Sequence, residues 1–458
     1  MKVIKRQIIR IMIVTLMLMS VVTGCASWAR SITTYSLDGV AGTISGQTIT
    51  VNMPYGTNVT DLVATFTTTG SSVKVGSTVQ VSGVTPNNFT NPVVYTVIAQ
   101  DGTTEEYTVT VKVAVLDSLP QTGQTGCYDA SGNAISCSGT GQDGDSQEGV
   151  AWPSQRFTTN SDATVTDNLT GLIWMPDGST PTLSTCAGGA MAWQDGLNYV
   201  SCLNTYNYLG HSDWRLPNRN ELRSLVNYEK ADTYSWLNTQ GFSNVQSGWY
   251  WSSTTDANLT SSAWYVDMDA GDVGDDVESD FYYVWPVRAG QGGVVEIPRT
   301  GQTASYSSGD DGSLQDGVSW PSKRFTTNSD TTVTDNLTGL IWMPDGSTPT
   351  LSTCAGGVMT WQDGLNYVSC LNTNSYLGYS DWRLPNINEL EILLNAGSAN
   401  TGTWLNTQGF SNVQSGWYWS STTDAGETVC AWSVSMYGQV TGTGKTYTYY
   451  VWPVRGGS

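Results

Sequence analysis

The sequence predicts a multidomain protein in which an all-β sandwich is followed by two α+β domains. Three observations predict it: strand-like alternation near the N-terminus, a long internal repeat, and an order of helix, helix and then strands within each copy. The chain has 458 residues. Because domains commonly contain about 100 to 200 residues, this length indicates two to four of them.

The composition excludes several function classes. The chain carries 19 Lys+Arg against 39 Asp+Glu, a formal net charge of -20, and a single His. It therefore has no basic stripe to neutralise phosphates, so nucleic acid is not an expected partner. One histidine, His211, also cannot supply a catalytic triad or a His-ligated metal to each of two repeats, so an enzyme of that kind is not expected.

Residues 31–115 alternate with a period of two, which is typical of half-buried strands separated by Gly, Asn and Pro turns. We interpret them as one all-β sandwich that acts as a spacer. The strings that carry the pattern resemble Ig-like or cadherin-like modules of bacterial surface proteins. They are Tyr35–Gly39, Thr48–Val51, Tyr95–Ile98, Asp101–Thr104 and Tyr107–Val111.

Residues 1–24 have the features of a secretory signal peptide. A basic start that includes Lys2 and Arg10 precedes the apolar run 11–22, which is short for a membrane span. The run ends in Val-Thr-Gly before Cys25, which resembles a bacterial lipoprotein signal whose cysteine is acylated. Since Ala26 and not Asp follows, this resemblance implies a lipid-anchored protein of the bacterial outer membrane, exposed at the cell surface.

Two tandem repeats fill the rest of the chain at an offset of 168 residues, so that Trp174 matches Trp342 and Trp214 matches Trp382. Each repeat is long enough to bury a core of its own. We expect a linker with a cysteine hairpin at 116–151, the first repeat at 152–290, a second linker at 291–318 and the second repeat at 319–458. The Leu-Pro-Gln-Thr-Gly string at 119–123 is read as linker, because it recurs as Ile-Pro-Arg-Thr-Gly at 297–301.

Each repeat begins with two predicted helices. Apolar residues recur at helical spacing over 191–203, and a second helix is expected over 218–226. Asn218 followed by Glu221 is the signature of a capping box, so we interpret both as helix-end residues. Short strands are expected at 249–253, 263–268 and 282–287.

Cysteine usage indicates an oxidising compartment. Two pairs recur at the same spacing in the two repeats, and a third pair flanks a short turn whose later counterpart lacks both cysteines. Cys430 is left over, at the position where the first repeat has Ser262. The predicted disulfide cysteines are Cys127 with Cys137, Cys186 with Cys202, and Cys354 with Cys370.

The repeats resemble the Lcl C-terminal domain family, named for a collagen-like bacterial adhesin. The strings that carry the resemblance include Val165–Trp174, Asp213–Asn218, Tyr250–Thr254 and Val284–Arg288, and the second repeat carries the same strings up to Arg455. This resemblance implies a C-type-lectin-like fold and adhesion or ligand binding at the cell surface. The acidic chain disfavours a polyanionic ligand, because like charges repel at encounter.

Comparison of the two copies indicates where a ligand binds. Between 157–205 and 325–373 only three of 49 positions differ, whereas 258–281 and 426–448 share few residues. In the strand 264–269 alternate residues are kept and the others change, which indicates a fixed core face and a rewritten outer face. We predict that the changed positions converge on one variable ligand-binding patch. They are Tyr206, Asn207, His211, Arg219, Tyr265, Asp267 and Asp269 in the first repeat, and Asn374, Ser375, Tyr379, Ile387, Ser433, Ser435 and Tyr437 in the second.

Besides a binding patch, drift on exposed loops or diversification by a retroelement could explain the changed positions. Exposed loops tolerate substitution without any role in binding. The enrichment in Tyr, Asn, Ser, Asp and His instead suits an adaptable binding surface, and it also resembles the variable proteins of diversity-generating retroelements.

Two kinds of chemistry are weighed against binding. Asp267, Asp269 and Asp272 are candidate calcium ligands in the first repeat, with a solvated acidic loop as the alternative. No cofactor is otherwise expected. The alternative function is an enzyme, either a glycosidase with two carboxylates or a formylglycine-generating-type oxidase with a reactive cysteine pair. Because the shared carboxylates occur in turn or cap contexts and the shared cysteines suit disulfides, we expect no catalysis.

The sequence as a whole therefore predicts a lipid-anchored surface adhesin or ligand-binding protein. Its two heads carry divergent binding faces, and its expected partners are a cell-surface glycan or protein and, through the lipid, the membrane.

Overall fold

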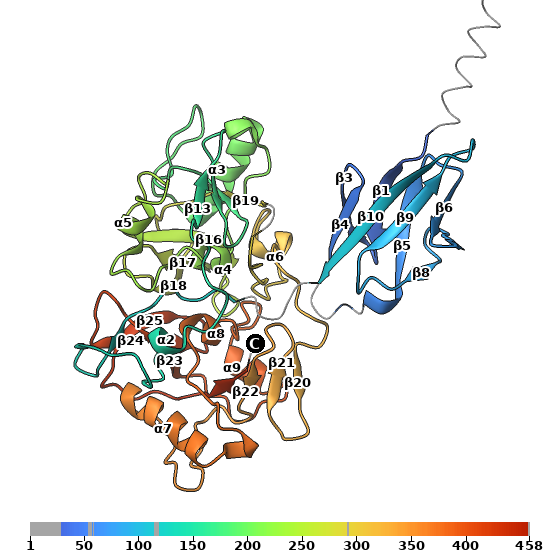
Figure 1. Ribbon diagram of the computed structural model, residues 1–458. Coiled ribbons are helices and arrows are strands. Elements are labelled where there is room, and N and C mark those ends of the chain that lie inside the picture. The colour runs from blue at the N-terminus through green and yellow to red at the C-terminus, as the bar shows by residue number, and fades with distance from the viewer. Residues whose placement is uncertain (1–28, 54–56, 58, 114–118, 291–292, 457–458) are drawn as a thin grey trace, which may run out of the picture. The chain divides into compact units, whose positions relative to one another are not determined.

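The computed structural model describes residues 29–53, 57, 59–113, 119–290 and 293–456 (Figure 1). By its contacts the chain divides into two compact units, residues 1–115 and 116–458, which are described separately. The proposed signal peptide and Cys25 lie outside the described residues. Within the described residues, no helix is long and apolar enough to cross a membrane.

The first unit is a β-sandwich of two sheets. One has the strand order β2-β1-β5-β8 and the other β3-β4-β10-β9-β6-β7. Alternate residues point into the core, as in β9, where Val93, Tyr95 and Val97 are buried and their neighbours are not. The strands are β1 (Ile32–Leu37), β2 (Val40–Ala41), β3 (Thr43–Ser45), β4 (Thr48–Met53), β5 (Leu62–Thr68), β6 (Ser72–Val75), β7 (Thr78–Val79), β8 (Pro86–Asn87), β9 (Val93–Ile98) and β10 (Thr104–Val113), with the 3-10 turn η2 (Val59–Asp61). The predicted all-β sandwich is confirmed.

The second unit begins with a linker and the first repeat. The linker contains the hairpin β11 (Cys127–Tyr128) and β12 (Ala134–Ile135) and the short helix α2 (Asp143–Ser146). The first repeat contains β13 (Phe157–Thr159), β14 (Val165–Asp167), β15 (Ile173–Trp174), α3 (Trp193–Thr205), η3 (Tyr208–Gly210), α4 (Arg219–Arg223), α5 (Thr233–Leu237), β16 (Trp249–Thr255), β17 (Ser262–Asp267), β18 (Val273–Val277) and β19 (Val287–Arg288). The predicted α+β class is confirmed, but the predicted order is wrong in one respect, because the strands β13, β14 and β15 precede the helices.

The second repeat has the same elements in the same order. They are α6 (Asp311–Leu314) in its linker, then β20 (Phe325–Thr327), β21 (Val333–Asp335), β22 (Ile341–Trp342), α7 (Trp361–Thr373), η4 (Tyr376–Gly378), α8 (Ile387–Glu391), α9 (Thr401–Leu405), β23 (Trp417–Thr423), β24 (Cys430–Ser435), β25 (Val440–Gly444) and β26 (Val454–Arg455). Each repeat closes its own four-stranded sheet, β13-β14-β15-β19 or β20-β21-β22-β26.

The predicted helices form because their ends and faces are well specified. Helix α3 buries Trp193, Leu197, Val200 and Leu203 on one face, at helical spacing. At the start of α4 the Asn218 side chain accepts the Glu221 N–H and the Glu221 carboxylate accepts the Asn218 N–H, so the predicted capping box is present. The strand expected at 282–287 is shorter: only 287–288 forms β19, while Tyr282 and Tyr283 make isolated bridges to Met191 and Tyr250.

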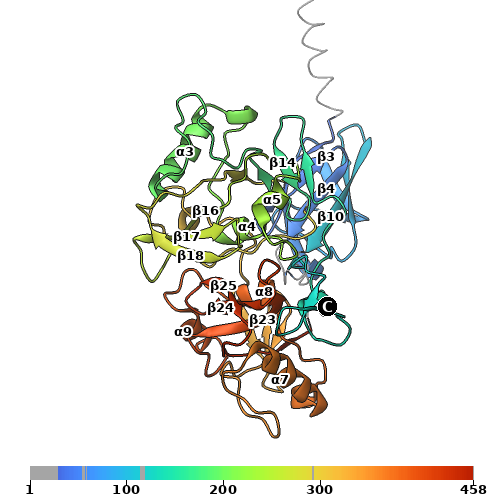
Figure 2. The ribbon, with the colours of Figure 1, turned by 90° about the vertical axis from the view of Figure 1, so that its left-hand side faces the viewer.

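The two repeats share one six-stranded sheet, with the order β16-β17-β18-β25-β24-β23. The repeats join where β18 pairs with β25, opposite Val273 and Val440, and Figure 2 shows these strands side by side. Both residues are fully buried, and the buried apolar residues of the two repeats form one continuous core. The tandem copies are therefore one folded body and not two independent heads.

Each linker packs on the repeat that it does not precede. The Gln124 side-chain amide bonds both backbone groups of Thr423 in the second repeat, at 2.6 and 2.8 Å. Gln302 does the same to Thr255 in the first repeat, at 2.6 and 3.1 Å. Thr422 donates to the Asp143 carboxylate at 2.7 Å, and the matching pair in the first repeat is Thr254 with Asp311 at 2.8 Å. This reciprocal exchange couples the stability of the two repeats.

Candidate functional site

An open aromatic groove lies on the outer face of the shared sheet in the first repeat, with a volume of about 360 Å³. Trp249 and Phe281 are 47% and 68% exposed, which is unusual for side chains of this size. The residues that line the groove are Ser247, Gly248, Trp249, Asp267, Asp269, Phe281, Tyr282 and Tyr283. We call it the first groove.

Strand pairing explains how these side chains meet. Trp249 of β16 lies opposite Asp267 of β17 in the antiparallel ladder. Along β17, Val266 and Met268 are fully buried, whereas Tyr265 and Asp267 are only partly covered and Asp269 is exposed. In the first repeat the alternation therefore has the orientation that the sequence predicts, with the kept residues inside and the changed residues outside.

The rings of the first groove support one another. The ring centroids of Trp249 and Tyr282 are 5.1 Å apart, those of Trp249 and Tyr265 are 5.9 Å apart, and those of Tyr265 and Tyr282 are 5.2 Å apart. The Tyr282 hydroxyl donates to the Asp276 carboxylate at 2.7 Å, which fixes the angle of its ring. The groove is thus a preformed aromatic platform edged by carboxylates.

Carboxylates dominate the electrostatics of the first groove. Burial raises the pKa of Asp267 above its usual value, and the nearby charges of Asp272 and Asp269 raise it further. The Asp269 N–H donates to Asp267 Oδ1 at 2.8 Å. Burial and the surrounding carboxylates, Asp276 first among them, also raise the pKa of Tyr265. The negative charge of the groove is therefore costly in the absence of a ligand.

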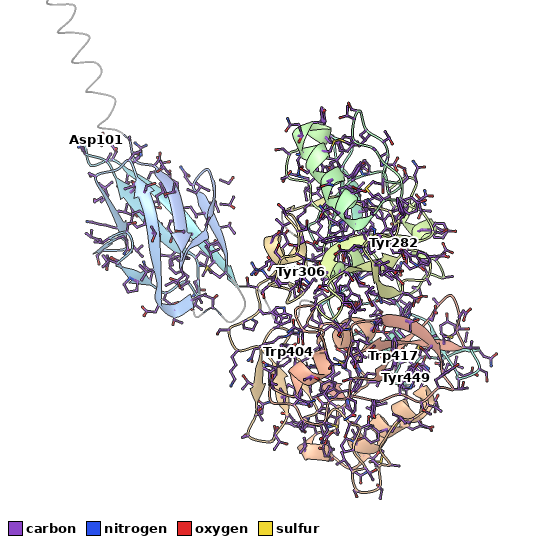
Figure 3. The ribbon with its side chains drawn as sticks, turned by 180° about the vertical axis from the view of Figure 1, so that it is seen from behind. Asp101, Tyr282, Tyr306, Trp404, Trp417 and Tyr449 are labelled. Carbon is purple, nitrogen blue, oxygen red and sulfur yellow. A yellow bond between two sulfur atoms is a disulfide. The ribbon has the colours of Figure 1, made fainter. Side chains whose placement is uncertain are left out.

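The second repeat keeps Trp417 and Tyr449 of the platform, but Ser433 and Thr448 replace the rings of Tyr265 and Phe281. Trp417 stacks on Tyr449 with centroids 5.9 Å apart and an interplanar angle of 23°, and the two lie beside each other in Figure 3. Ser435 and Tyr437 stand where the first groove has Asp267 and Asp269. Tyr437 and Tyr447 are exposed. We call the surface around Trp417 and Tyr449 the second groove by its equivalence to the first; its exposed neighbours Tyr437 and Tyr447 are uncharged, and Ser435 is buried.

The aromatic residues that both repeats keep are not among the predicted binding residues, whereas Tyr265 and Tyr437 are. Trp249, Tyr282 and Tyr283 are identical in the two repeats, as Trp417, Tyr449 and Tyr450. A comparison that searched for changed positions therefore passed over them. The sequence feature that could have identified the groove is a Trp that both repeats keep, on a strand directly opposite an Asp that differs between them.

The changed positions at the end of α3 do not reach the groove, so their predicted convergence on one patch is wrong. Tyr206 caps the C-terminal end of α3, and it is 56% exposed. Asn207 and His211 follow it in the chain. The groove residue Tyr282 pairs with Met191, just before the N-terminal end of the same helix. Because α3 has 13 residues, about 18 Å separates its two ends.

His211 has a structural partner that its counterpart keeps. His211 Nε2 is 2.8 Å from Asp162 Oδ2, and the hydroxyl of the matching Tyr379 donates to Asp330 Oδ2 at 2.5 Å. The hydrogen bond of Thr164 and then that of His211 lower the pKa of Asp162 to about 2. The difference between His211 and Tyr379 therefore preserves a hydrogen bond to an equivalent aspartate, Asp162 or Asp330. In the second repeat Asn374 bonds the Cys370 carbonyl at 2.9 Å, and the adjacent Ser375 precedes η4.

Four predicted binding residues are buried, which corrects their assignment to an exposed face. Ile387 and Ser433 have no exposed surface, and Arg219 and Ser435 are almost as covered. Arg219 Nη2 lies 3.2 Å from Glu391 Oε1, and its guanidinium lies 4.5 Å from the centre of the Trp264 ring. The outward face of β17 is accessible in the first repeat. The equivalent face of β24 in the second repeat is buried at Ser433 and Ser435.

Divergence at Arg219 and Ile387 instead belongs to the contact between the repeats. Arg223 Nε donates to Glu391 Oε2 at 3.0 Å, and these two residues occupy the same position in their respective copies. Arg223 also donates to the Gly271 carbonyl, and Arg219 to that of Gly438 at 2.9 Å. An arginine in one copy therefore faces a glutamate in the other.

The candidate calcium ligands do not form a metal site. Among the described residues, no group of three or more His, Cys, Asp or Glu is placed to hold a metal ion. Asp267 accepts a backbone N–H in a hairpin turn, and Asp272 follows that turn. The acidic run after it is not a solvated loop either, because Val273–Val277 is strand β18.

The cysteines pair as predicted. Disulfides join Cys127 to Cys137, Cys186 to Cys202, and Cys354 to Cys370. Cys430 is unpaired and buried, and burial raises the pKa of its thiol to about 11. A raised pKa leaves little thiolate at neutral pH.

The family comparisons agree with this architecture. The Lcl C-terminal domain family matches residues 163–288 and 331–455, which together exceed half of the chain, so the chain belongs to that family. The family described as "SGBP, N-terminal" matches residues 32–111, the sandwich. The two families indicate a surface-binding protein.

Solved structures give weaker likenesses. A putative secreted protein from Bacteroides fragilis is 18% identical, with 19% of this chain and 98% of that chain covered and a TM-score of 0.16. A putative glycoside hydrolase from Bacteroides thetaiotaomicron is 13% identical, with 58% and 84% covered and a TM-score of 0.17. No curated protein gives a significant sequence match.

Proposed function

We propose that this protein is a lipid-anchored, surface-exposed adhesin of the bacterial outer membrane that binds glycans through its two aromatic grooves. The observation that carries the proposal is the first groove, where an exposed Trp249 stands in a preformed hollow beside two carboxylates. The "SGBP, N-terminal" match supports a glycan over a protein ligand, since SGBP denotes surface glycan-binding protein.

The chemistry of the groove suits a sugar. A pyranose ring has an apolar face of C–H groups that packs on an aromatic ring, and hydroxyls around its edge that need hydrogen-bond acceptors. In the first groove, Trp249 and Tyr282 offer the rings, and Asp267 and Asp269 offer carboxylate oxygens at the edge. Shallow, open sites of this kind hold one or two sugar units of a longer chain.

Binding without catalysis is part of the proposal. A formylglycine-generating-type oxidase would need a reactive cysteine pair, whereas the cysteines shared by both repeats form disulfides and Cys430 has no cysteine partner within the described residues. A glycosidase needs a pair of carboxylates, and the second groove has Ser435 and Tyr437 at the positions of Asp267 and Asp269. Diversification by a retroelement is not included, because Arg219, Ile387, Ser433 and Ser435 are buried.

A glycan array probed with the full chain without its signal peptide tests the proposal. We expect discrete glycans to bind the wild-type protein, and the Trp249→Ala/Trp417→Ala double variant to lose them. Tyr206→Ala is the matched control, because Tyr206 is an exposed aromatic residue at the opposite end of α3 from the first groove. Full binding by the double variant, or equal loss with Tyr206→Ala, would contradict the assignment of the grooves.

A further inference from the structure

We infer that the first groove selects glycans that carry a free amine, whereas the second groove takes uncharged sugars. This inference rests on the proposed function and adds the chemical class of the ligand. It starts from a difference in charge between the two platforms: Asp267 and Asp269 line the first, whereas the equivalent positions in the second repeat are the buried Ser435 and the exposed Tyr437.

The two carboxylates that line the first groove, Asp267 and Asp269, take part in none of the ion pairs of the described residues. Asp267 is flanked by like charges and partly buried, so its charged form is disfavoured in the empty groove. Of the acidic residues nearby, Asp276 accepts from the Tyr282 hydroxyl, Asp275 accepts from Gln439 of the second repeat, and Asp272 lies near the Arg223 guanidinium. A cation at this edge would relieve both the repulsion and the loss of water.

The aromatic platform makes an ammonium group a better occupant than a metal ion. A metal ion needs several oxygen ligands that converge, and no such group is present among the residues that the structure describes. An ammonium group needs only a ring face and one or two carboxylates. Trp249, Tyr265 and Asp267 supply these within one ladder of two strands.

The same fold already holds an ammonium group on a tryptophan elsewhere. Lys445 Nζ lies 4.2 Å from the centre of the Trp361 ring and donates to the Thr428 carbonyl at 3.0 Å. That pair is internal to the second repeat and its docked linker. It demonstrates a ring and an oxygen acceptor sharing one ammonium group in this architecture, which is the arrangement inferred for a sugar amine over Trp249.

Matched oligosaccharides separate charge from shape. Hexamers of glucosamine and of N-acetylglucosamine share one backbone, but only the former carries ammonium groups at about pH 6.5. In a full chain with Trp417→Ala, which silences the second groove, calorimetry should give about tenfold tighter binding of the glucosamine hexamer. The preference should fall as salt is added, because partly exposed charges are screened.

Two further variants on that background locate the effect. Asp267→Ser/Asp269→Tyr introduces the residues of the second repeat and should bring the two affinities within about twofold. Trp249→Ala should abolish binding of both sugars. Unchanged thermal unfolding of each variant verifies that the fold is intact.

The outcomes distinguish the two proposals. If both hexamers bind equally and Trp249→Ala removes both, the amine inference is wrong and glycan binding stands. If poly-lysine binds as tightly as the glucosamine hexamer, charge alone is recognised and the amino-sugar assignment is overturned. If neither hexamer binds and no glycan on the array does, the proposed function itself fails.

Discussion

The two repeats are nearly identical in the long segments that build their common frame, and they differ at surfaces that face solvent or the other repeat. Between 157–205 and 325–373 only three of 49 positions differ, and all 22 positions match between 236–257 and 404–425. Differences lie at the edge of the aromatic groove, at the contact between the copies and after α3, where His211 matches Tyr379. Of these three places, only the first is proposed to contact a ligand.

The contact between the repeats required divergence for an electrostatic reason. In a symmetric pair, equivalent residues near the axis face one another, so like charges would meet. Here Arg223 of the first copy faces Glu391 of the second, and Arg219 joins the same carboxylate. Identical copies would have placed two buried arginines or two buried glutamates together. The changes make the copies complementary and hold both grooves on one folded body.

The strongest way to break this complementarity is Glu391→Gln. The variant removes the carboxylate that both Arg219 and Arg223 hydrogen-bond, which we expect to lower the free energy of unfolding by about 3 to 5 kcal/mol. Urea unfolding followed by tryptophan fluorescence measures it. Asp213→Asn is the control, since its pair with Arg288 is exposed and should cost less than about 1 kcal/mol. Equal costs for the two variants would refute the account of the contact.

The equivalent disulfides of the two repeats should contribute equally to stability. Each of Cys186–Cys202 and Cys354–Cys370 spans 16 residues. Replacing either pair by serine should cost about 3 kcal/mol by the loop-entropy relation. The two costs should agree closely, because the surrounding segments are almost identical. A difference of more than about 1 kcal/mol, measured by urea unfolding, would mean that the frames are not equivalent.

The linker carboxylates give an effect of pH. Burial raises the pKa of Asp143 to about 6 and that of Asp311 to about 6, from a usual value of 3.8. The folded state therefore binds more protons than the unfolded state between about pH 4 and 6, so these groups lower the stability as the pH rises through that window. Above about pH 6, where the change is complete, each group should have lowered the free energy of unfolding by about 2 to 3 kcal/mol.

Asp143→Asn/Asp311→Asn removes both titrations and tests this sign. The stability of the wild-type chain minus that of the variant should be greater at pH 4.5 than at pH 7. An unchanged or opposite difference would show that neither carboxyl is protonated first in the folded state.

Local features of the fold were predictable from the sequence, and long-range ones were not. Apolar spacing located α3, and the Asn218 and Glu221 pair located the capped start of α4. Strand β18 was not predicted, because Val-Gly-Asp-Asp-Val lacks alternation and is held by neighbours that include the other repeat. The exchange of linkers was equally hidden, since a glutamine such as Gln124 gives no sign of which repeat it will bond.

The candidate site was predicted in part. The strand alternation identified Tyr265 and Asp267, which do lie on the outward face of β17, and Asp269, which lies in the turn after it. Tyr206, Asn207 and His211 were assigned to the same patch because sequence distance carries no information about which end of α3 a loop occupies. The invariant rings of Trp249 and Tyr282 were not found, since a search for change cannot detect what both copies keep.

Two sites with separate specificities are the centre of this account, and single-groove variants examined on one glycan array test it most directly. Trp249→Ala and Trp417→Ala should each remove a different subset of the glycans that bind the wild-type chain, with amine-bearing glycans in the first subset and uncharged ones in the second. If the two variants lose the same glycans, or if neither loses any, the copies do not hold distinct sites.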